Sequence, residues 1–210
     1  MDATEWDARY AERELVWSAT PNATVETELA DLPPGRALDL ACGEGRNAIW
    51  LAARGWDVEA VDFSEVALDK ARALARSQGV EARWRAVDLA DARPFEPADV
   101  VLIAYLHLPR AVLRGVHRAA AEAVAPGGIL LIVGHARTNL AYGTGGPQDP
   151  DLLLDLDEVR DDLAGTGVTV ERAAEIDREV ETEDGPRTAI DVVVRARRPA
   201  RAGDVTRRSA

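Results

Sequence analysis

The segment LDLACGEGRNAIW, residues 38–50, carries the residue types best suited to bind a ligand. Two glycines, Gly43 and Gly45, stand between an apolar run and a stretch with helical spacing. Glycine is needed where the backbone turns sharply and where a ligand must approach the main chain without meeting a Cβ atom. A strand, a glycine turn and a helix in this order predict a site for a cofactor that contains a nucleoside. The Gly-x-Gly pattern alone fits a dinucleotide equally well.

Acidic residues near the predicted strand ends separate the possible cofactors. Asp39 precedes the glycine turn, where a carboxylate repels a pyrophosphate but attracts an ammonium or a sulfonium. Asp62 ends the next apolar run, where a carboxylate can bind the hydroxyls of a ribose. Asp88 ends a third run and can accept a hydrogen bond from an adenine amine, although a plain turn residue is the alternative. The dinucleotide fingerprint also needs a third small residue, which Ala48 supplies only loosely. These features favour S-adenosylmethionine over a dinucleotide.

Short apolar runs alternate with longer amphipathic stretches from residue 36 onward, which is typical of an α/β fold with a mostly parallel, doubly wound sheet. The turn residues around 183–186 predict an antiparallel hairpin at the end. The residues before 34 predict two helices, the second capped by Asn22. The expected strands are 36–41, 56–62, 82–88, 98–106, 129–135, 167–176 and 188–197. The expected helices are 2–14, 22–31, 47–54, 64–77, 109–124 and 152–163.

From about residue 5 to 197 the chain resembles class I S-adenosylmethionine-dependent methyltransferases, and the stretch LDLACGEGRNAIWLAARGWDVEAVD is similar to the tellurite-resistance methyltransferase group. The resemblance implies a seven-stranded Rossmann-like sheet with an antiparallel last strand. It also implies that Asp39, Gly43 and Gly45 hold the methionine moiety and that Asp62 binds the ribose. Family members often have glycine where Ala41 stands. The further cofactor-binding residues implied are Ala41, Asn47, Phe63, Asp88, Leu89 and Ala104.

The methyl acceptor is expected to bind where the carboxyl ends of the strands meet. His107 and His135 each follow a predicted strand, and His135 opens a Gly- and Pro-rich loop, residues 135–150, that is too long for a routine connection. We expect His135 and Asn139 to orient the acceptor, with His135 as the candidate general base. His107 is the alternative, or it packs beside neighbouring leucines. His117 falls in a predicted helix and is expected at the surface.

The first residues contain three aromatic side chains, Trp6, Tyr10 and Trp17, which either belong to the core or form a lid over the cofactor. We predict that residues 1–34 form an N-terminal helical extension and that 35–198 form the methyltransferase domain. Residues 199–210 are predicted to be a disordered basic tail. The basic cluster near the end is expected to be solvated rather than to bind nucleic acid; it comprises Arg195, Arg197, Arg198, Arg201, Arg207 and Arg208.

Composition limits the partners. The net charge of −12 repels nucleic acid, and the Asn/Asp-Pro-Pro-aromatic signature for nucleobase amines is absent from AYLHLPR, residues 104–110. No apolar run is long enough for a membrane helix, and the charged N-terminus does not suggest export. The lone cysteine, Cys42, fits a reducing cytoplasm and is expected to pack in the glycine turn rather than to act as a nucleophile.

We therefore expect a cytoplasmic enzyme that methylates a small molecule at an oxygen, nitrogen or chalcogen centre. The acidic run 149–162 has no metal-ligand spacing, so no metal is expected. Two other functions fit the same glycine turn, namely a nicotinamide-dependent oxidoreductase and a non-catalytic cofactor-binding regulatory protein.

Overall fold

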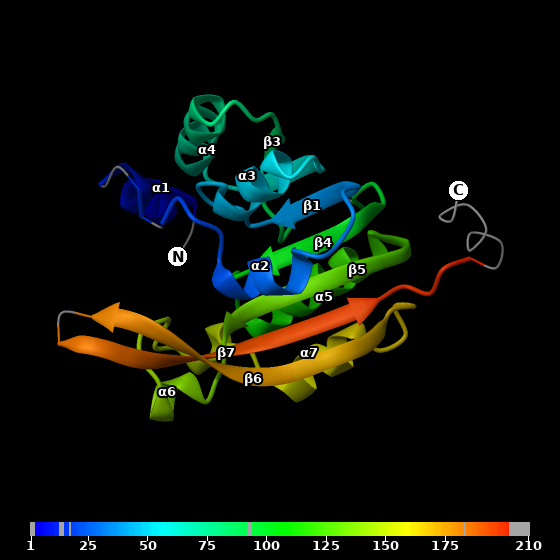
Figure 1. Ribbon diagram of the computed structural model, residues 1–210. Coiled ribbons are helices and arrows are strands. Elements are labelled where there is room, and N and C mark those ends of the chain that lie inside the picture. Colours follow the sequence, from blue (N-terminus) through cyan, green and yellow to red (C-terminus); the bar gives the residue numbers. More distant parts are fainter. Residues whose placement is uncertain (1–2, 13–14, 17, 92–93, 183, 202–210) are drawn as a thin grey trace.

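The computed structural model describes residues 3–12, 15–16, 18–91, 94–182 and 184–201, and within these it contains a seven-stranded sheet of order β3-β2-β1-β4-β5-β7-β6 (Figure 1). The strands are β1 Arg36–Leu40, β2 Asp57–Asp62, β3 Arg83–Ala86, β4 Ala98–Ala104, β5 Val124–His135, β6 Thr169–Thr182 and β7 Gly185–Arg197. The helices are α1 Ala3–Ala11, α2 Ala23–Leu29, α3 Arg46–Ala53, α4 Glu65–Ser77, α5 Arg110–Glu122, α6 Asn139–Tyr142 and α7 Leu156–Leu163, with a 3₁₀ turn at Pro150–Leu152.

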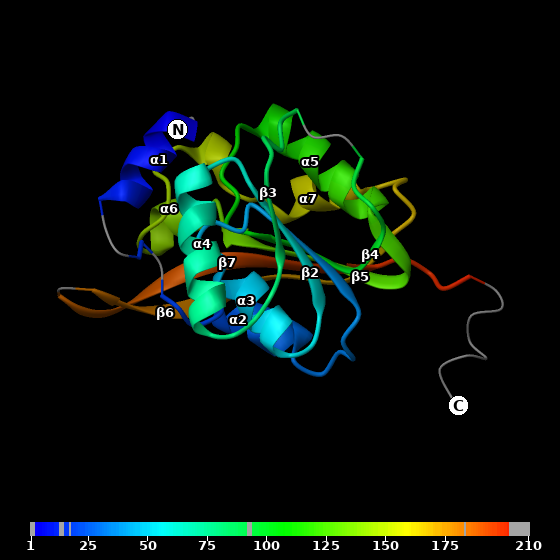
Figure 2. The ribbon, with the colours of Figure 1, turned by 90° about the horizontal axis from the view of Figure 1, so that it is seen from above.

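The strand directions confirm the predicted fold class. The first five strands pair in parallel, whereas β7 runs antiparallel to both β5 and β6. Central strands such as β4 and β5 are apolar along most of their length because helices cover both faces of the sheet. Figure 2 shows α2 and α3 on one side of the sheet and α5 and α7 on the other.

Two hydrophobic cores fill the spaces between the sheet and these helices. On one face, Leu29 of α2 and Leu51 of α3 pack against alternate residues of the strands, such as Leu102 and Leu131. On the other face, Leu113 of α5 packs against the residues that lie next to these in the same strands and point in the opposite direction. Alternation within a strand therefore assigns each side chain to one of the two cores.

Most predicted elements occur within a few residues of their expected bounds, and Asn22 and Ser64 cap α2 and α4 through their side chains. The largest difference is the final hairpin, because β6 and β7 extend well beyond the runs that the alternation predicted. The predicted loop after β5 contains the short helix α6, and the predicted helix 152–163 begins only after its cap, Asp155. None of the helices in the described residues is both long and apolar enough to cross a membrane.

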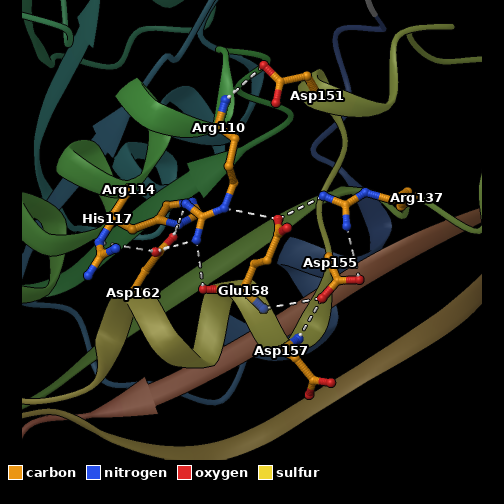
Figure 3. Close-up of polar contacts among 9 residues, drawn as sticks. All are labelled: Arg110, Arg114, His117, Arg137, Asp151, Asp155, Asp157, Glu158 and Asp162. Atoms are coloured by element: carbon orange, nitrogen blue, oxygen red, sulfur yellow. Dashed lines mark hydrogen bonds and ion pairs between the residues drawn. The ribbon is translucent and has the colours of Figure 1, made fainter.

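The prediction for His117 is wrong, since this side chain is buried between α5 and α7. Its Nδ1 lies 2.9 Å from Oδ2 of Asp162, and Arg110 donates two hydrogen bonds to the same carboxylate (Figure 3). Helical spacing among alanines and arginines did not reveal that α7 covers this side of α5. The cluster joins α5 to α7.

Part of the basic cluster was also misplaced. Arg195 and Arg197 lie on β7 and form ion pairs with Glu171, and Arg198 donates to the carbonyl oxygens of Ala121 and Thr166. These arginines therefore fasten the sheet edge instead of forming a tail. Arg207 and Arg208 lie outside the described residues, as does Trp17.

Candidate active site

A cavity of about 310 Å³ lies at the carboxyl edge of the sheet. It extends from the glycine turn after β1 to the segments that follow β4 and β5, and Trp6 and Tyr10 of α1 line it as well. The residues proposed from the sequence that line it are Ala41, Gly43, Asn47, Asp62, Phe63, Ala104, His107 and His135. Open α/β sheets place their ligands at this edge.

The glycine turn has the backbone conformation that glycine favours. Gly43 and Gly45 have φ angles of 54° and 79°, in the left-handed region. A Cβ atom on Gly45 would lie 2.6 Å from the ring of Trp84, so this glycine also permits close packing against β3. Ala41 has a φ of 61° at the position where family members often have glycine.

Asp39 is a buried acid whose oxygens lack a well-formed hydrogen bond to any described residue. Burial, together with the charge of Asp62, raises its pKa from 3.8 to about 7. The charge of Arg46 and a backbone hydrogen bond from Ala48 oppose this shift without cancelling it, so a further cation nearby would stabilise the ionised carboxylate. S-adenosylmethionine carries such a cation on its methionine moiety, and the site therefore fits this cofactor.

Asp62 supports the glycine turn and faces the cavity. Its Oδ2 accepts a hydrogen bond from the Gly43 amide at 2.8 Å, and its Oδ1 accepts one from the Ser64 amide at 2.9 Å. Each carboxylate oxygen has a second lone pair that can accept a ribose hydroxyl. Burial raises the pKa of Asp62, although these backbone hydrogen bonds oppose the shift. The neighbouring Phe63 is half-buried and lines the same cavity.

Four of the predicted cofactor residues do not line this cavity, namely Asp39, Gly45, Asp88 and Leu89. Asp88 is exposed, and its Oδ1 accepts a hydrogen bond from the Ala90 amide. Leu89 packs against the core on the α5 side. Asp39 lies behind the turn. The contacts of Asp88 are therefore those of a turn residue, which was the alternative interpretation from the sequence.

The part of the cavity formed by the segments after β4 and β5 contains two stacked histidines. The rings of His107 and His135 are nearly parallel, with their centroids 5.7 Å apart. Nδ1 of His107 lies 3.3 Å from the carbonyl oxygen of Leu152. Burial lowers the pKa of His107 to about 4, so its imidazole is neutral at pH 7.

The polar side chains that surround His135 were not predicted from the sequence. Asp191, on β7, is fully buried, and one of its oxygens accepts hydrogen bonds from the Tyr105 hydroxyl and from Nε of Arg178, both at 2.6 Å. Its other oxygen lies 3.1 Å from Nδ1 of His135. The available signal was an acid in the apolar run TAIDVVV. These partners hold the pKa of Asp191 below its usual value, even though burial acts in the opposite direction.

Asn139 does not reach the cavity, which corrects its expected contact with the acceptor. It is buried, its Oδ1 accepts a hydrogen bond from the Ile190 amide at 2.7 Å, and its Nδ2 donates to the carbonyl oxygens of Thr144 and Gly145. Its amide is therefore used to fasten the loop to β7. The sequence predicted a contact between Asn139 and the acceptor because this polar residue lies in the loop after β5. In the structure its side chain forms hydrogen bonds with backbone groups instead.

The N-terminal segment is attached to the glycine turn. Glu44, which is buried, accepts a hydrogen bond from the Val16 amide and forms an ion pair with Lys70 at 3.2 Å. Oδ1 of Asn47 accepts a hydrogen bond from the Asn22 amide. Thus two residues of the GEGRN motif hold the segment that places Trp6 and Tyr10 over the cavity.

Residues 37–128 match the methyltransferase domain family. The chain is similar to a solved structure from work on the conversion of a disulfide bond into a thioacetal group during echinomycin biosynthesis, with 26% identity, a TM-score of 0.74 and coverage of 97% of this chain and 95% of the other. TehB from Haemophilus influenzae gives 20% identity and a TM-score of 0.72 over 85% of this chain and 62% of its own. The S-adenosylhomocysteine-bound magnesium protoporphyrin IX methyltransferase from Synechocystis is 18% identical, with a TM-score of 0.66. The match covers 94% of this chain and 88% of the other.

Curated relatives match over shorter stretches. Hemagglutinin 1 of Eikenella corrodens is 32% identical over 39% of this chain, and ribosomal RNA small subunit methyltransferase C of Alcanivorax borkumensis is 36% identical over 27% of it. The matches span only 27% and 17% of the lengths of those two proteins. Residues 37–128 therefore match a methyltransferase domain, and nearly the whole chain shares the fold of S-adenosylmethionine-dependent methyltransferases.

Proposed function

We propose that this protein transfers a methyl group from S-adenosylmethionine to a small-molecule acceptor by in-line displacement. One observation carries the proposal, namely that a single cavity joins the glycine turn to the His107–His135 pair. A cofactor at one end and a proton acceptor at the other can then serve the same reaction. Holding reactants in this way is the main catalytic contribution that such a transfer needs.

The cofactor end is assigned from the contacts of the chain's own residues. Asp39 is proposed to attract the methionine ammonium group, Asp62 to bind the ribose hydroxyls and Phe63 to pack against the adenine. When bound, the cofactor supplies a methyl group activated by its positively charged sulfur. The other residues proposed to surround it are Ala41, Gly43, Gly45, Asn47, Asp88, Leu89 and Ala104.

The acceptor end is assigned to His135 as general base, with His107 beside it. Asn139 acts through the loop that it fastens. We further propose that residues 1–34 act as a lid, because Trp6 and Tyr10 line the cavity and a closed site excludes water. The charge of −12 and the small cavity favour a small molecule over nucleic acid, and the single cysteine favours a cytoplasmic location.

Calorimetry separates this function from the alternatives. We expect S-adenosylhomocysteine to bind and NAD not to bind, and we expect turnover with a member of an acceptor panel. Binding of NAD alone would support a nicotinamide-dependent oxidoreductase. Binding of S-adenosylhomocysteine without turnover across phenols, alcohols, amines and thiols would support a regulatory protein.

A further inference from the structure

The His135 ring is confined on several sides. His107 stacks on it, the ring of Tyr105 meets it edge-on at a centroid distance of 5.1 Å, and Asp191 lies 3.1 Å from its Nδ1. A Cβ atom on Gly146 would lie 2.6 Å from its Cδ2, so the loop backbone also packs directly on the ring. These contacts restrict the ring to one orientation.

This loop contact depends on Asn139. Its side chain donates to the carbonyl oxygens of Thr144 and Gly145, immediately before Gly146. A Cβ atom on Gly143 would lie 1.8 Å from Oδ1 of Asn139, so the glycine-rich sequence lets the loop fold around this amide. The glycines and Asn139 thus hold the loop against His135.

The orientation of the ring decides which nitrogen can take a proton. Nδ1 faces a fully buried carboxylate, and neither Nδ1 nor Oδ1 of Asp191 has another hydrogen-bond partner among the described residues. A small rotation lets Nδ1–H donate to Asp191 and satisfies both atoms. Nε2 then has the lone pair, and the ring lines the cavity.

The two histidines are not equivalent as bases. The pKa of His107 is about 4, whereas that of a phenol is about 10. Complete transfer of the proton from a phenol to His107 is therefore unfavourable by a factor of about a million. Nδ1 of His135 faces the Asp191 carboxylate at 3.1 Å, whereas Nδ1 of His107 faces the neutral carbonyl group of Leu152. His107 can therefore accept a hydrogen bond from the acceptor, but the proton goes to His135.

We propose that Asp191 is a positioning residue that holds His135 with Nε2 ready to take a proton, and that the methyl acceptor is a planar, largely apolar molecule with a phenol-type hydroxyl. This inference rests on the proposed methyltransferase function. It selects one acceptor class, because a thiolate or other soft anion needs no base and an aliphatic alcohol is too weakly acidic for an imidazole.

The lining of the cavity agrees with that acceptor. Trp6, Tyr10, Leu106 and Leu108 provide aromatic and apolar surface near the histidine pair. In the transfer, His135 Nε2 takes the hydroxyl proton while the oxygen lone pair forms the bond to the methyl carbon. The electrons of the carbon–sulfur bond remain on sulfur, and the proton passes from His135 to solvent.

The first test needs neither cofactor nor acceptor. In ¹⁵N NMR spectra of the wild-type protein at high pH, we expect neutral His135 as the Nδ1–H tautomer. Asp191→Asn should produce a mixture of tautomers, whereas Tyr105→Phe, which removes one hydrogen bond to Asp191 but keeps its charge, should not. An Nε2–H tautomer in the wild type would overturn the proposal even if the Asp191 variant did not fold.

The second test measures turnover. Asp191→Asn should lower kcat for a phenolic acceptor by about 10²- to 10⁴-fold with little change in KM. The charged or titratable groups facing His135 are Asp191, Arg178, Tyr105 and His107. Asp69→Asn, which removes an exposed carboxylate on α4, is the control for this change of charge.

Two failures can be distinguished. Thiols or amines methylated faster than phenols, with Asp191→Asn as active as the wild type, would overturn this inference and leave the methyltransferase function intact. Absence of turnover across the whole panel would overturn both.

Discussion

Replacing Asp39 by asparagine should have opposite effects on the free protein and on its complex with S-adenosylhomocysteine. The unfolded chain ionises this carboxyl near pH 3.8, but the folded protein does so only near pH 7. The folded state therefore binds a proton that the unfolded state has lost between these values. Stability that is fully present below pH 3.8 is lost as the pH rises toward 7.

The size of the effect follows from the pKa. At pH 8 the buried carboxylate costs about 4 kcal/mol, since each pH unit of difference corresponds to about 1.4 kcal/mol. Asparagine carries no charge, but it still buries a poorly satisfied amide, which costs about 1–3 kcal/mol. We expect Asp39→Asn to raise the free energy of unfolding of the free protein by about 1–3 kcal/mol at pH 8, and to give no gain below pH 4.

Ligand binding should change in the other direction. Loss of a hydrogen bond to a charged partner costs about 1.5–3 kcal/mol, which corresponds to about 10- to 150-fold weaker binding of S-adenosylhomocysteine. The wild type should also release part of a proton on binding at pH 7, because the ammonium group favours ionised Asp39. Calorimetry in two buffers of different ionisation enthalpy measures this release, and it should vanish in the variant.

Asp69→Asn serves as the matched control, because Asp69 is exposed on α4 and forms a surface ion pair with Arg72. It should change stability by less than about 1 kcal/mol and leave the affinity unaltered. A less stable Asp39→Asn protein at pH 8 combined with unchanged affinity would refute both the burial argument and the ammonium assignment.

Five further changes test other parts of the structure. Asp62→Ala should weaken S-adenosylhomocysteine binding at least about tenfold by calorimetry and lower stability by about 1–3 kcal/mol, since two backbone amides lose their acceptor. Asp162→Ala should lower the free energy of unfolding by about 1.5–3 kcal/mol in urea, because the half-buried Arg110 and the buried His117 lose a charged hydrogen-bond partner. Deletion of residues 1–16 should reduce turnover more than cofactor affinity. Ala41→Gly should be neutral or stabilising by up to about 1 kcal/mol, whereas Gly79→Ala, at a φ of 68° with open space around it, should be destabilising by about 1 kcal/mol in the same melts.

Local sequence was enough to predict that the glycine turn and Asp62 lie at the carboxyl edge of the sheet. The glycine turn, Asp39 and Asp62 lie on or beside single strand ends, and parallel strands bring such ends together at one edge of the sheet. The same reasoning placed His107 and His135 in one cavity. Nothing beyond the order of the strands was required for these residues.

The acceptor end depended on contacts that local patterns do not specify. Tyr105 and Asp191 are 86 residues apart in the chain, and the register of β7 on β5 brings His135 opposite Asp191. Residue type also failed to predict burial for His117 and Asn139. Both were taken to face solvent or ligand, but neighbouring elements cover them and use their polar atoms.

The position of the cavity has a topological cause. The order β2-β1-β4-β5 reverses the direction of winding between β1 and β4, so the loops after these two strands separate and leave a crevice. Ala41 and Tyr105 follow these strands, and both have a left-handed backbone that side chains rarely adopt. The Tyr105 hydroxyl donates to Asp191 and accepts from Asn22, so β7 and the start of α2 hold its strained conformation in place. The N-terminal segment, the switch between strands and the His135 site therefore meet at one side chain, and ordering any one of them favours the other two.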